Sequence, residues 1–245
     1  MILHNAVRQK RENKRRERAR RCLDIVSEPA ILPPVAHGRF ITFEGGEGTG
    51  KSTQLKRLAA RLEAEGREVV ATREPGGSPG AEDIRALVLR GQADRWSPVT
   101  ETLLMYAARR DHVERVIRPA LARGAWVACD RFADSTRAYQ GAAGGTDPAL
   151  IAALETHILE DTLPDLTLVF DMPVSVGLDR AHARAGAEMR FESKGLAFHE
   201  RLREAYLAIA RAEPGRCVLI DASGTLDEVE GRVWAAVQNR LATNA

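Results

Sequence analysis

Cysteine and aromatic residues are scarce in this chain. Its 245 residues include three cysteines, Cys22, Cys129 and Cys217, which is an odd number and contains no C-x-x-C pair. This argues against a disulfide framework and favours a reducing, cytoplasmic compartment with isolated, buried thiols. Aromatic residues make up 5% of the chain, and its three tryptophans lie too far apart along the sequence to form a platform for stacking bases.

Long apolar runs and a strong net charge are also missing. No stretch of 18 or more apolar residues occurs, so a membrane-spanning helix is not expected. The formal net charge of +2 gives the chain as a whole no preference for polyanions. Hydrophobic residues at 44% and charged residues at 29% are typical of a globular enzyme with one large domain or two small ones.

Positive charge is concentrated near the N-terminus. Residues 1–36 hold nine basic and four acidic residues, and no apolar segment follows the basic run RQKRENKRRERARR (8–21), which argues against a signal peptide. We expect residues 1–37 to form a basic, poorly ordered extension, and a nucleic-acid-binding arm is the alternative. The proline-rich stretch EPAILPPVAHG (28–38) is typical of a linker, which predicts one folded domain over residues 38–245.

Strand and helix patterns alternate through this domain. Short apolar runs predict strands at residues 39–44, 67–74, 125–130, 165–171 and 216–221. Helices are predicted at residues 51–66, 81–91, 98–124, 148–162, 174–185, 195–212 and 225–242. This alternation, with almost continuously apolar strands, indicates an α/β fold with a parallel sheet covered by helices on both faces. In such sheets, ligands bind beyond the carboxyl ends of the strands.

A phosphate-binding loop follows the first predicted strand. The segment GGEGTGKST (45–53) matches G-x4-G-K-[ST] and lies between a strand and a helix, as this motif requires. Its glycines let backbone N–H groups converge on phosphate oxygens, and the helix N-terminus adds partial positive charge. We expect Lys51 to reach the β- and γ-phosphates of ATP and Ser52 to hold Mg²⁺. The residues expected at the ATP phosphates are Gly45, Gly46, Glu47, Gly48, Thr49, Gly50, Lys51, Ser52 and Thr53.

Arginine-containing stretches distinguish between the functions that such a loop serves. No N-K-x-D motif for guanine is present, which disfavours a GTPase. Arginines instead occur where they could hold a second phosphate, in TREPGGSPG (72–80), LLMYAARR (103–110), DRFADSTRAYQG (130–141) and RAHARAGAEMRFE (180–192). An enzyme that brings two polyanions together needs such positive charge and exclusion of water, and no covalent nucleophile.

These stretches, together with LAFHERLREAYL (196–207), resemble the thymidylate kinases, in the same order and over about residues 38–240. The resemblance implies a P-loop NTPase three-layer α/β/α fold with a five-stranded parallel sheet. It implies phosphoryl transfer from ATP to dTMP, giving ADP and dTDP for dTTP synthesis, with Mg²⁺, in a homodimer. No arginine lies between Gly46 and Gly50, so the chain resembles the bacterial-type branch, in which a lid, here about residues 182–194, supplies the catalytic arginine.

The resemblance also implies a role for each matching residue. Arg73 matches the arginine for the acceptor phosphate, Arg131 the one that bridges donor and acceptor, and Asp130 the acid beside the metal. In the lid, Arg190 matches the transition-state arginine and Arg184 contacts the ATP phosphates. The catalytic set is Lys51, Asp130, Arg131 and Arg190, and the metal ligands are Ser52 and Asp130. The dTMP-binding set is Glu47, Arg73, Met105, Arg109, Arg131, Ser135, Tyr139 and Gln140.

Met105 departs from the common pattern of the family, which has a phenylalanine that stacks on thymine at this position. Methionine still covers a ring face, but a kinase for another nucleotide is the first alternative function. A nucleic-acid-binding protein that uses the basic arm is the second. Arg110 is expected to be a solvated helix residue and Asp171 a structural one, whereas Glu44 is left open between a structural and a functional role.

Overall fold

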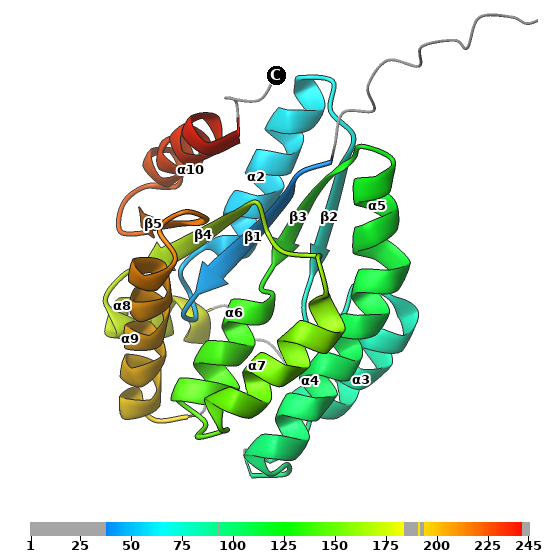
Figure 1. Ribbon diagram of the computed structural model, residues 1–245. Helices are drawn as coiled ribbons and strands as arrows, with labels where there is room; N and C mark the ends of the chain where they lie inside the picture. Colours follow the sequence, from blue (N-terminus) through cyan, green and yellow to red (C-terminus); the bar gives the residue numbers. More distant parts are fainter. Residues whose placement is uncertain (1–37, 93, 184–190, 192–193, 242–245) are drawn as a thin grey trace, which may run out of the picture. The chain divides into compact units, whose positions relative to one another are not determined.

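The core of the fold is a five-stranded parallel sheet with the strand order β2-β3-β1-β4-β5 (Figure 1). The computed structural model describes residues 38–92, 94–183, 191 and 194–241. Its strands are β1 (Phe40–Gly45), β2 (Val69–Arg73), β3 (Trp126–Asp130), β4 (Leu166–Asp171) and β5 (Cys217–Asp221). Phe43 pairs with Asp130 and Arg73 also pairs with Asp130, so the carboxyl ends of β1, β2 and β3 meet at one edge. The predicted five-stranded parallel sheet is confirmed.

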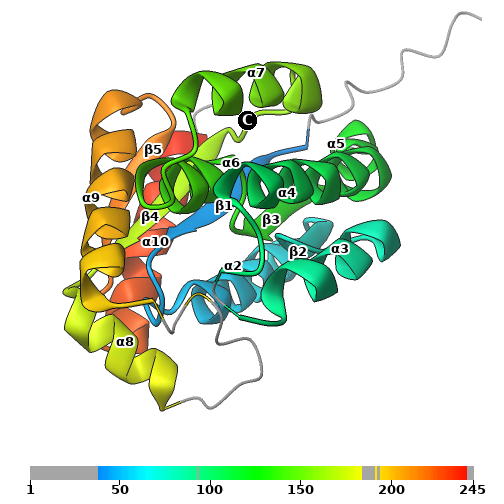
Figure 2. The ribbon, with the colours of Figure 1, turned by 90° about the horizontal axis from the view of Figure 1, so that it is seen from below.

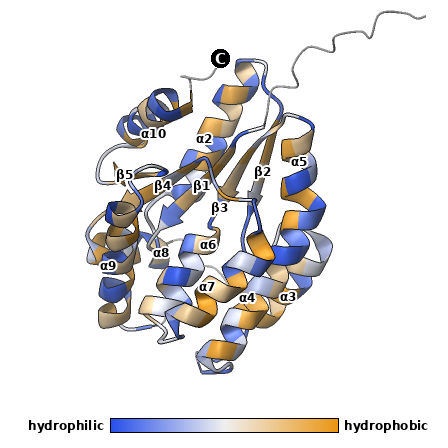
Figure 3. Cartoon of the chain, viewed as in Figure 1, coloured by the Kyte–Doolittle hydropathy of each residue, from blue (hydrophilic) through white to orange (hydrophobic). Residues whose placement is uncertain are grey.

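Helices cover both faces of the sheet (Figures 1 and 2). α2 (Lys51–Ala64) and α10 (Leu226–Leu241) pack on one face, over a buried cluster that includes Ile41 and Phe43. α5 (Arg118–Ala122), α6 (Ala133–Thr136) and α9 (Leu196–Ala212) pack on the other face, toward which Phe40 points. Figure 3 shows the central strands as predominantly hydrophobic and the helices as mixed, as a sheet buried on both faces requires.

Three of the remaining helices begin at proline. α3 (Pro79–Leu89), α4 (Pro98–His112) and α7 (Pro148–Leu159) each have it as the first helical residue, where its missing N–H costs no hydrogen bond. Ser97 and Asp147 cap α4 and α7 through hydrogen bonds from the N–H groups of the first turn. α8 (Val174–His182) follows β4. α3 and α7 both pack against α4, so α4 is held in place where it faces the site.

Two helical segments differ from their predictions. The helix expected over residues 98–124 contains a π-helical segment, η1 (Val113–Ile117), between α4 and α5. It ends two residues before Pro119, which has no N–H to donate to the preceding turn. α6 and a π-helical segment, η2 (Arg137–Ala142), were not predicted. Every residue of α6 is buried, so it has no solvated face and its sequence lacks the periodicity of an amphipathic helix.

The remaining predictions about the chain concern cysteines, membranes and the termini. Cys129 and Cys217 are free and buried, as expected, whereas Cys22 lies outside the described residues. In the part of the chain that the structure describes, none of the helices has the length and apolar character to cross a membrane. The predicted extension at residues 1–37 and most of the predicted lid also lie outside the described residues.

Candidate active site

The phosphate-binding loop connects β1 to α2 at the carboxyl edge of the sheet. Gly48 and Gly50 have φ angles of 69° and 89°, in the left-handed region that favours glycine. A Cβ at Gly48 would lie 1.8 Å from the carbonyl oxygen of Gly177 in α8, so a side chain has no room there. Lys51 closes the loop, because its Nζ donates hydrogen bonds to the carbonyl oxygens of Gly45 (3.1 Å) and Gly46 (2.6 Å).

Opposite charges are buried together around this loop. Burial and the nearby charge of Arg131 lower the pKa of Lys51 to about 8, although the carboxylates of Glu47 and Asp130 oppose the shift. Burial alone would raise the pKa of Glu47, but Arg131, Lys51 and a hydrogen bond from Tyr139 outweigh it and lower that pKa to about 2. The loop therefore carries a fixed negative charge at Glu47 next to two cations.

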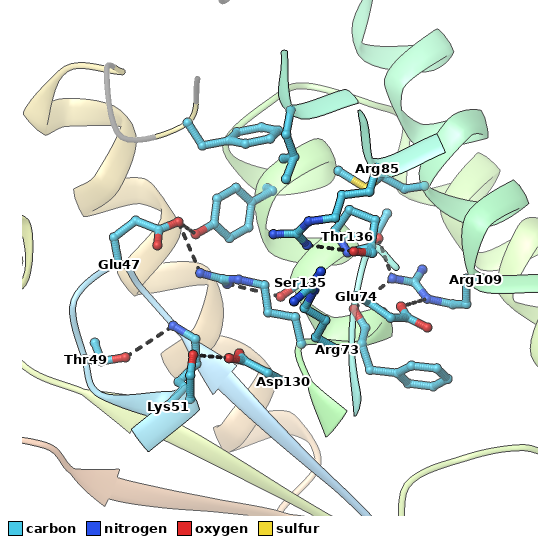
Figure 4. Close-up of a pocket in the computed structure, with 18 of the residues that line it drawn as sticks. Glu47, Thr49, Lys51, Arg73, Glu74, Arg85, Arg109, Asp130, Ser135 and Thr136 are labelled. Atoms are coloured by element: carbon cyan, nitrogen blue, oxygen red, sulfur yellow. Dashed lines mark hydrogen bonds and ion pairs between the residues drawn. The ribbon is translucent and has the colours of Figure 1, made fainter. Parts of the chain in front are cut away.

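A pocket of about 360 Å³ opens beside the loop (Figure 4). Its volume is in the range of sites that bind small molecules. It brings together most residues of the predicted site, namely Glu47, Gly48, Thr49, Gly50, Lys51, Ser52, Arg73, Met105, Arg109, Asp130, Arg131, Ser135, Tyr139 and Gln140. Gly45, Gly46 and Thr53 do not line it. Arg184 and Arg190 lie outside the described residues.

Arg131 occupies the centre of the site with an unusual backbone conformation. Its φ is 70°, which is rare for a residue other than glycine, and its N–H donates to the carbonyl oxygen of Phe43 (2.9 Å). The guanidinium donates to Glu47 Oε1 (3.1 Å), which also accepts the hydroxyl hydrogen of Tyr139 (2.6 Å). Such a left-handed residue, held by the neighbouring strand, aims its guanidinium across the pocket toward the loop.

Two oxygen-bearing side chains meet where α2 begins. The hydroxyl of Ser52 donates a hydrogen bond to the carboxylate of Asp130, at the end of β3. Hydroxyl and carboxylate oxygens are ligands that Mg²⁺ accepts together with phosphate oxygens and water. Among the described residues, no group of three or more histidine, cysteine, aspartate or glutamate side chains forms a metal site. The pair therefore fits a cation that is bound mainly through a nucleotide.

Glu44 supports the segment that carries Arg131. Its buried carboxylate accepts hydrogen bonds from the N–H of Phe132 (2.7 Å), the hydroxyl of Ser135 (2.6 Å) and the hydroxyl of Tyr206 (3.3 Å). Burial raises its pKa to about 7, and the negative charge of Asp134 adds to this effect, although the hydrogen bonds oppose it. The contacts favour the structural role that the sequence left open for Glu44.

We expect Glu44 to make the protein less stable as the pH rises from 4.5 to about 7. A carboxyl group with a raised pKa holds its proton more tightly when folded, so the free energy of unfolding falls over this interval. Glu44→Gln should make that fall smaller, by up to about 3 kcal/mol. Urea unfolding at both ends of the interval measures it, with Glu114→Gln on the surface of η1 as the control. An equal fall in Glu44→Gln and wild type would contradict this prediction.

Arg109 reaches the site from α4, but it is not exposed to solvent. Its side chain is 3% exposed, and Nε donates to Oε2 of Glu74 (2.7 Å) in a buried ion pair. Its Nη2 donates to the carbonyl oxygen of Phe132 (2.9 Å) and to Thr136 Oγ1 (3.0 Å). Arg110, by contrast, pairs with Glu114 and Glu160 on the surface, as expected for a helix arginine outside the site.

Several residues of the pocket were not predicted from the sequence. Glu74, Pro75, Arg85, Leu89, Phe132, Thr136 and Phe191 also line it. Figure 4 shows Arg85 pointing into the pocket from α3, and Nη1 of this residue donates to the carbonyl oxygen of Pro75 (2.7 Å). Glu74 directly follows Arg73 at the carboxyl end of β2, and this position could have indicated it as a site residue. Asp171 pairs with Arg203 of α9 and does not line this pocket, in line with the structural role expected for it.

The comparisons with known proteins decide the family. A family model described as thymidylate kinase matches residues 43–233. The chain belongs to the thymidylate kinase family. It is 68% identical over 207 residues to the thymidylate kinase of Caulobacter vibrioides, a match that covers 84% of this chain and 99% of the relative. It is 57% identical over 218 residues to the thymidylate kinase of Bradyrhizobium diazoefficiens, which covers 88% and 96%.

A solved structure agrees with these matches. The crystal structure of the thymidylate kinase from Ehrlichia chaffeensis is similar with a TM-score of 0.68 at 34% identity, over 82% of this chain and all of that chain. The predicted family, the P-loop NTPase fold and the kinase activity of a thymidylate kinase are thereby confirmed. The roles of single residues remain predictions, and the geometry of the pocket shows which of them are able to act together.

Proposed function

We propose that the pocket binds dTMP beside the phosphate-binding loop and that the enzyme transfers the γ-phosphoryl group of ATP to it, giving ADP and dTDP with Mg²⁺. The observation that carries this assignment is the convergence of Lys51, Arg73 and Arg131 on one pocket. These three cations come from α2, from the end of β2 and from the residue after β3. Phosphoryl transfer needs such a cluster to hold donor and acceptor in line and to stabilise the charge of the transition state.

The transferring groups would be held from two sides. Lys51 and the backbone of residues 45–53 bind the donor phosphates, and Arg73 binds the acceptor phosphate through its two terminal nitrogens. Arg131 lies between them and contacts both. Its guanidinium is paired with Glu47, a carboxylate that we assign, with Tyr139, to the sugar of dTMP. No side chain has to form a covalent intermediate, because the acceptor phosphate oxygen attacks directly.

Ser52 and Asp130 would hold Mg²⁺, directly or through water. The side-by-side hydroxyl and carboxylate at the start of α2 support this assignment. The bound ion would neutralise charge on the donor phosphates. Asp130 also accepts the hydrogen bond of the Ser52 hydroxyl, which orients that hydroxyl.

The base of dTMP would lie deeper in the same pocket. Met105 of α4 and Phe191 offer apolar surface, and Arg109 and Gln140 offer polar groups. The amide of Gln140 donates to Glu101 (2.9 Å), which fixes its orientation. A second, more open pocket suits the adenine of ATP, and it is lined by Gly48, Gly50, Arg180, Gly224, Thr225 and Leu226. We assign Arg190 and Arg184 to the transferring and donor phosphates on the family resemblance alone.

We further propose a homodimer in the cytoplasm. The dimer rests on the family resemblance and on three exposed apolar side chains of α3 and α4, Leu87, Val99 and Leu103. Light scattering of the purified protein at two concentrations tests it, and a monomer mass at both would exclude it. The location rests on the free thiols of Cys129 and Cys217, and cell fractionation tests it.

A nucleotide panel tests the proposed reaction. We expect rapid ADP release from ATP and Mg²⁺ with dTMP, slower release with dUMP, and little with dCMP, dGMP or dAMP. Arg73→Ala should lower kcat/KM for dTMP by about 10²-fold, because one charged contact to the acceptor phosphate is lost. Arg110→Ala is the matched control on the surface and should keep the activity. Turnover of another monophosphate in place of dTMP would instead support the alternative that Met105 suggests.

A further inference from the structure

Three buried ionisable side chains form a chain of contacts behind the pocket. Glu74 follows β2, and Arg109 and His112 lie one helical turn apart on α4. One carboxylate oxygen of Glu74 accepts a hydrogen bond from Arg109 Nε (2.7 Å), and the other lies 3.0 Å from His112 Nδ1. His112 is fully buried, and its Nε2 lies 2.7 Å from Thr72 Oγ1. The contacts run from the strand through His112 and Glu74 to Arg109.

Each member of this chain restricts the next one. A carboxylate can rotate about its terminal bond, but Glu74 has one oxygen fixed by His112 and presents the other to Arg109. Because the carboxylate only accepts, Nδ1 carries the hydrogen of the His112–Glu74 contact. The space around His112 is closed, since a Cβ at Gly77 would lie 2.5 Å from Nε2. Both ring nitrogens of His112 are in hydrogen-bond contact, one with Glu74 and one with Thr72, so the imidazole is held toward Glu74.

One guanidinium nitrogen of Arg109 is available to donate to a ligand. Its Nε and Nη2 donate hydrogen bonds, but Nη1 is buried and has no hydrogen-bond partner in the part of the chain that the structure describes. A buried donor without a partner is costly, and Arg109 lines the pocket. A guanidinium only donates. It therefore suits a base that presents a carbonyl oxygen and disfavours one that presents an amino group.

We propose that His112 is a positioning residue that acts through Glu74 to orient Arg109 and so sets the preference for a pyrimidine with a carbonyl oxygen over one with an amino group. This inference rests on the proposed binding of dTMP in this pocket. His112 does not line the pocket, so we expect it to act on the substrate only through Glu74 and Arg109. Its effect is expected on recognition of the acceptor base and not on the transfer step, in which Lys51 and Arg131 act.

Two substitutions of His112 separate positioning from structural support. The amide nitrogen of Asn takes the place of Nδ1, so His112→Asn keeps a donor for Glu74 and loses the contact with Thr72. The longer Gln places its amide near Nε2, so His112→Gln keeps the contact with Thr72 and loses the donor for Glu74. Each variant loses one buried hydrogen bond, so a merely structural role predicts similar effects of both.

We expect His112→Gln to raise KM for dTMP and to lower the ratio of kcat/KM for dTMP over dCMP by about tenfold, as loss of one hydrogen bond does, with kcat changed less than about threefold. His112→Asn should retain most of the ratio. Thr72→Val, the matched control, removes the other partner of His112 and should also retain it. Equal ratios in the Asn and Gln variants, or a wild-type ratio in His112→Gln, would overturn the proposal.

Glu74→Gln keeps the test decisive if His112→Gln does not fold. It preserves the shape of Glu74 but removes the charge that pairs with Arg109, so it should lower the same ratio. An unchanged ratio in Glu74→Gln would also overturn the proposal. Wild-type protein without dTMP turnover would refute the proposed function instead, whereas selective wild-type turnover with unaffected variants refutes only the role of His112.

Discussion

Arg131→Met should lower kcat by about 10³-fold, because it removes the only described side chain that we place between both phosphates. The guanidinium donates to the loop carbonyl of Gly45 (3.0 Å) and to Glu47 (3.1 Å), so it lies against the phosphate-binding loop. Stabilisation of the transition state depends on groups placed before the reaction begins. The loss should therefore appear mainly in kcat. Steady-state kinetics with ATP and dTMP measures it.

Arg131→Lys separates the effect of the positive charge from that of the guanidinium geometry. Lysine keeps the positive charge but cannot contact two groups through separate nitrogens, so it should restore only part of the rate. Arg110→Met, on the surface of α4, should keep wild-type kcat. Thermal unfolding of each variant confirms that it is folded, which matters because Arg131 has a φ of 70° and Ser135 and Tyr206 also accept its hydrogen bonds. A kcat of Arg131→Met within about threefold of wild type would exclude a role for Arg131 in the transfer.

Lys51→Met should weaken ATP binding and lower kcat by about 10²- to 10³-fold. Lys51 Nζ is held by two loop carbonyl oxygens and by Thr49 Oγ1 (3.3 Å), so methionine removes the charge and three hydrogen bonds while filling a similar volume. Lys56→Met changes an exposed lysine of the same helix and serves as the control. Isothermal titration calorimetry with ATP, in the absence of dTMP, measures the binding loss directly.

The pH dependence of ATP binding gives Lys51 a specific signature. Burial and the charge of Arg131 lower the pKa of Lys51 to about 8, and bound phosphates would raise it. Above this pH the free enzyme loses the proton that the complex retains, so ATP binding takes up a proton and the Kd rises by up to about tenfold per pH unit. Lys51→Met should lack this additional rise. An identical pH dependence in wild type and variant would show that Lys51 does not contact the donor phosphates.

Local patterns in the sequence predicted the parts of the site that lie close together along the chain. The phosphate-binding loop is recognised by its glycines and a lysine within residues 45–53. The strand before it is apolar along most of its length, and the helix after it is amphipathic. The ends of the strands could be predicted because each strand is a short, local apolar run. These ends place Arg73 and Asp130 at one edge of the sheet.

Contacts between distant segments could not be predicted in this way. The ion pair of Arg109 with Glu74 joins residues 35 positions apart, and its geometry depends on where α3 and α7 hold α4. Tyr206 lies on a helix that was predicted, but nothing in its spacing indicates that its hydroxyl reaches Ser135 (2.8 Å) and Arg131 (3.2 Å). α6 was missed because a fully buried helix has no polar face to give a period.

The most direct test of the proposed transfer follows the γ-phosphoryl group itself. Wild-type protein is mixed with Mg²⁺, dTMP and ATP that is radiolabelled at the γ-phosphorus, and the products are separated by thin-layer chromatography. We expect the label to appear in dTDP in an amount equal to the ADP formed, and ADP formation to require dTMP. Label found only in inorganic phosphate, or ADP formed equally well without dTMP, would contradict the assignment of this pocket to phosphoryl transfer between ATP and dTMP.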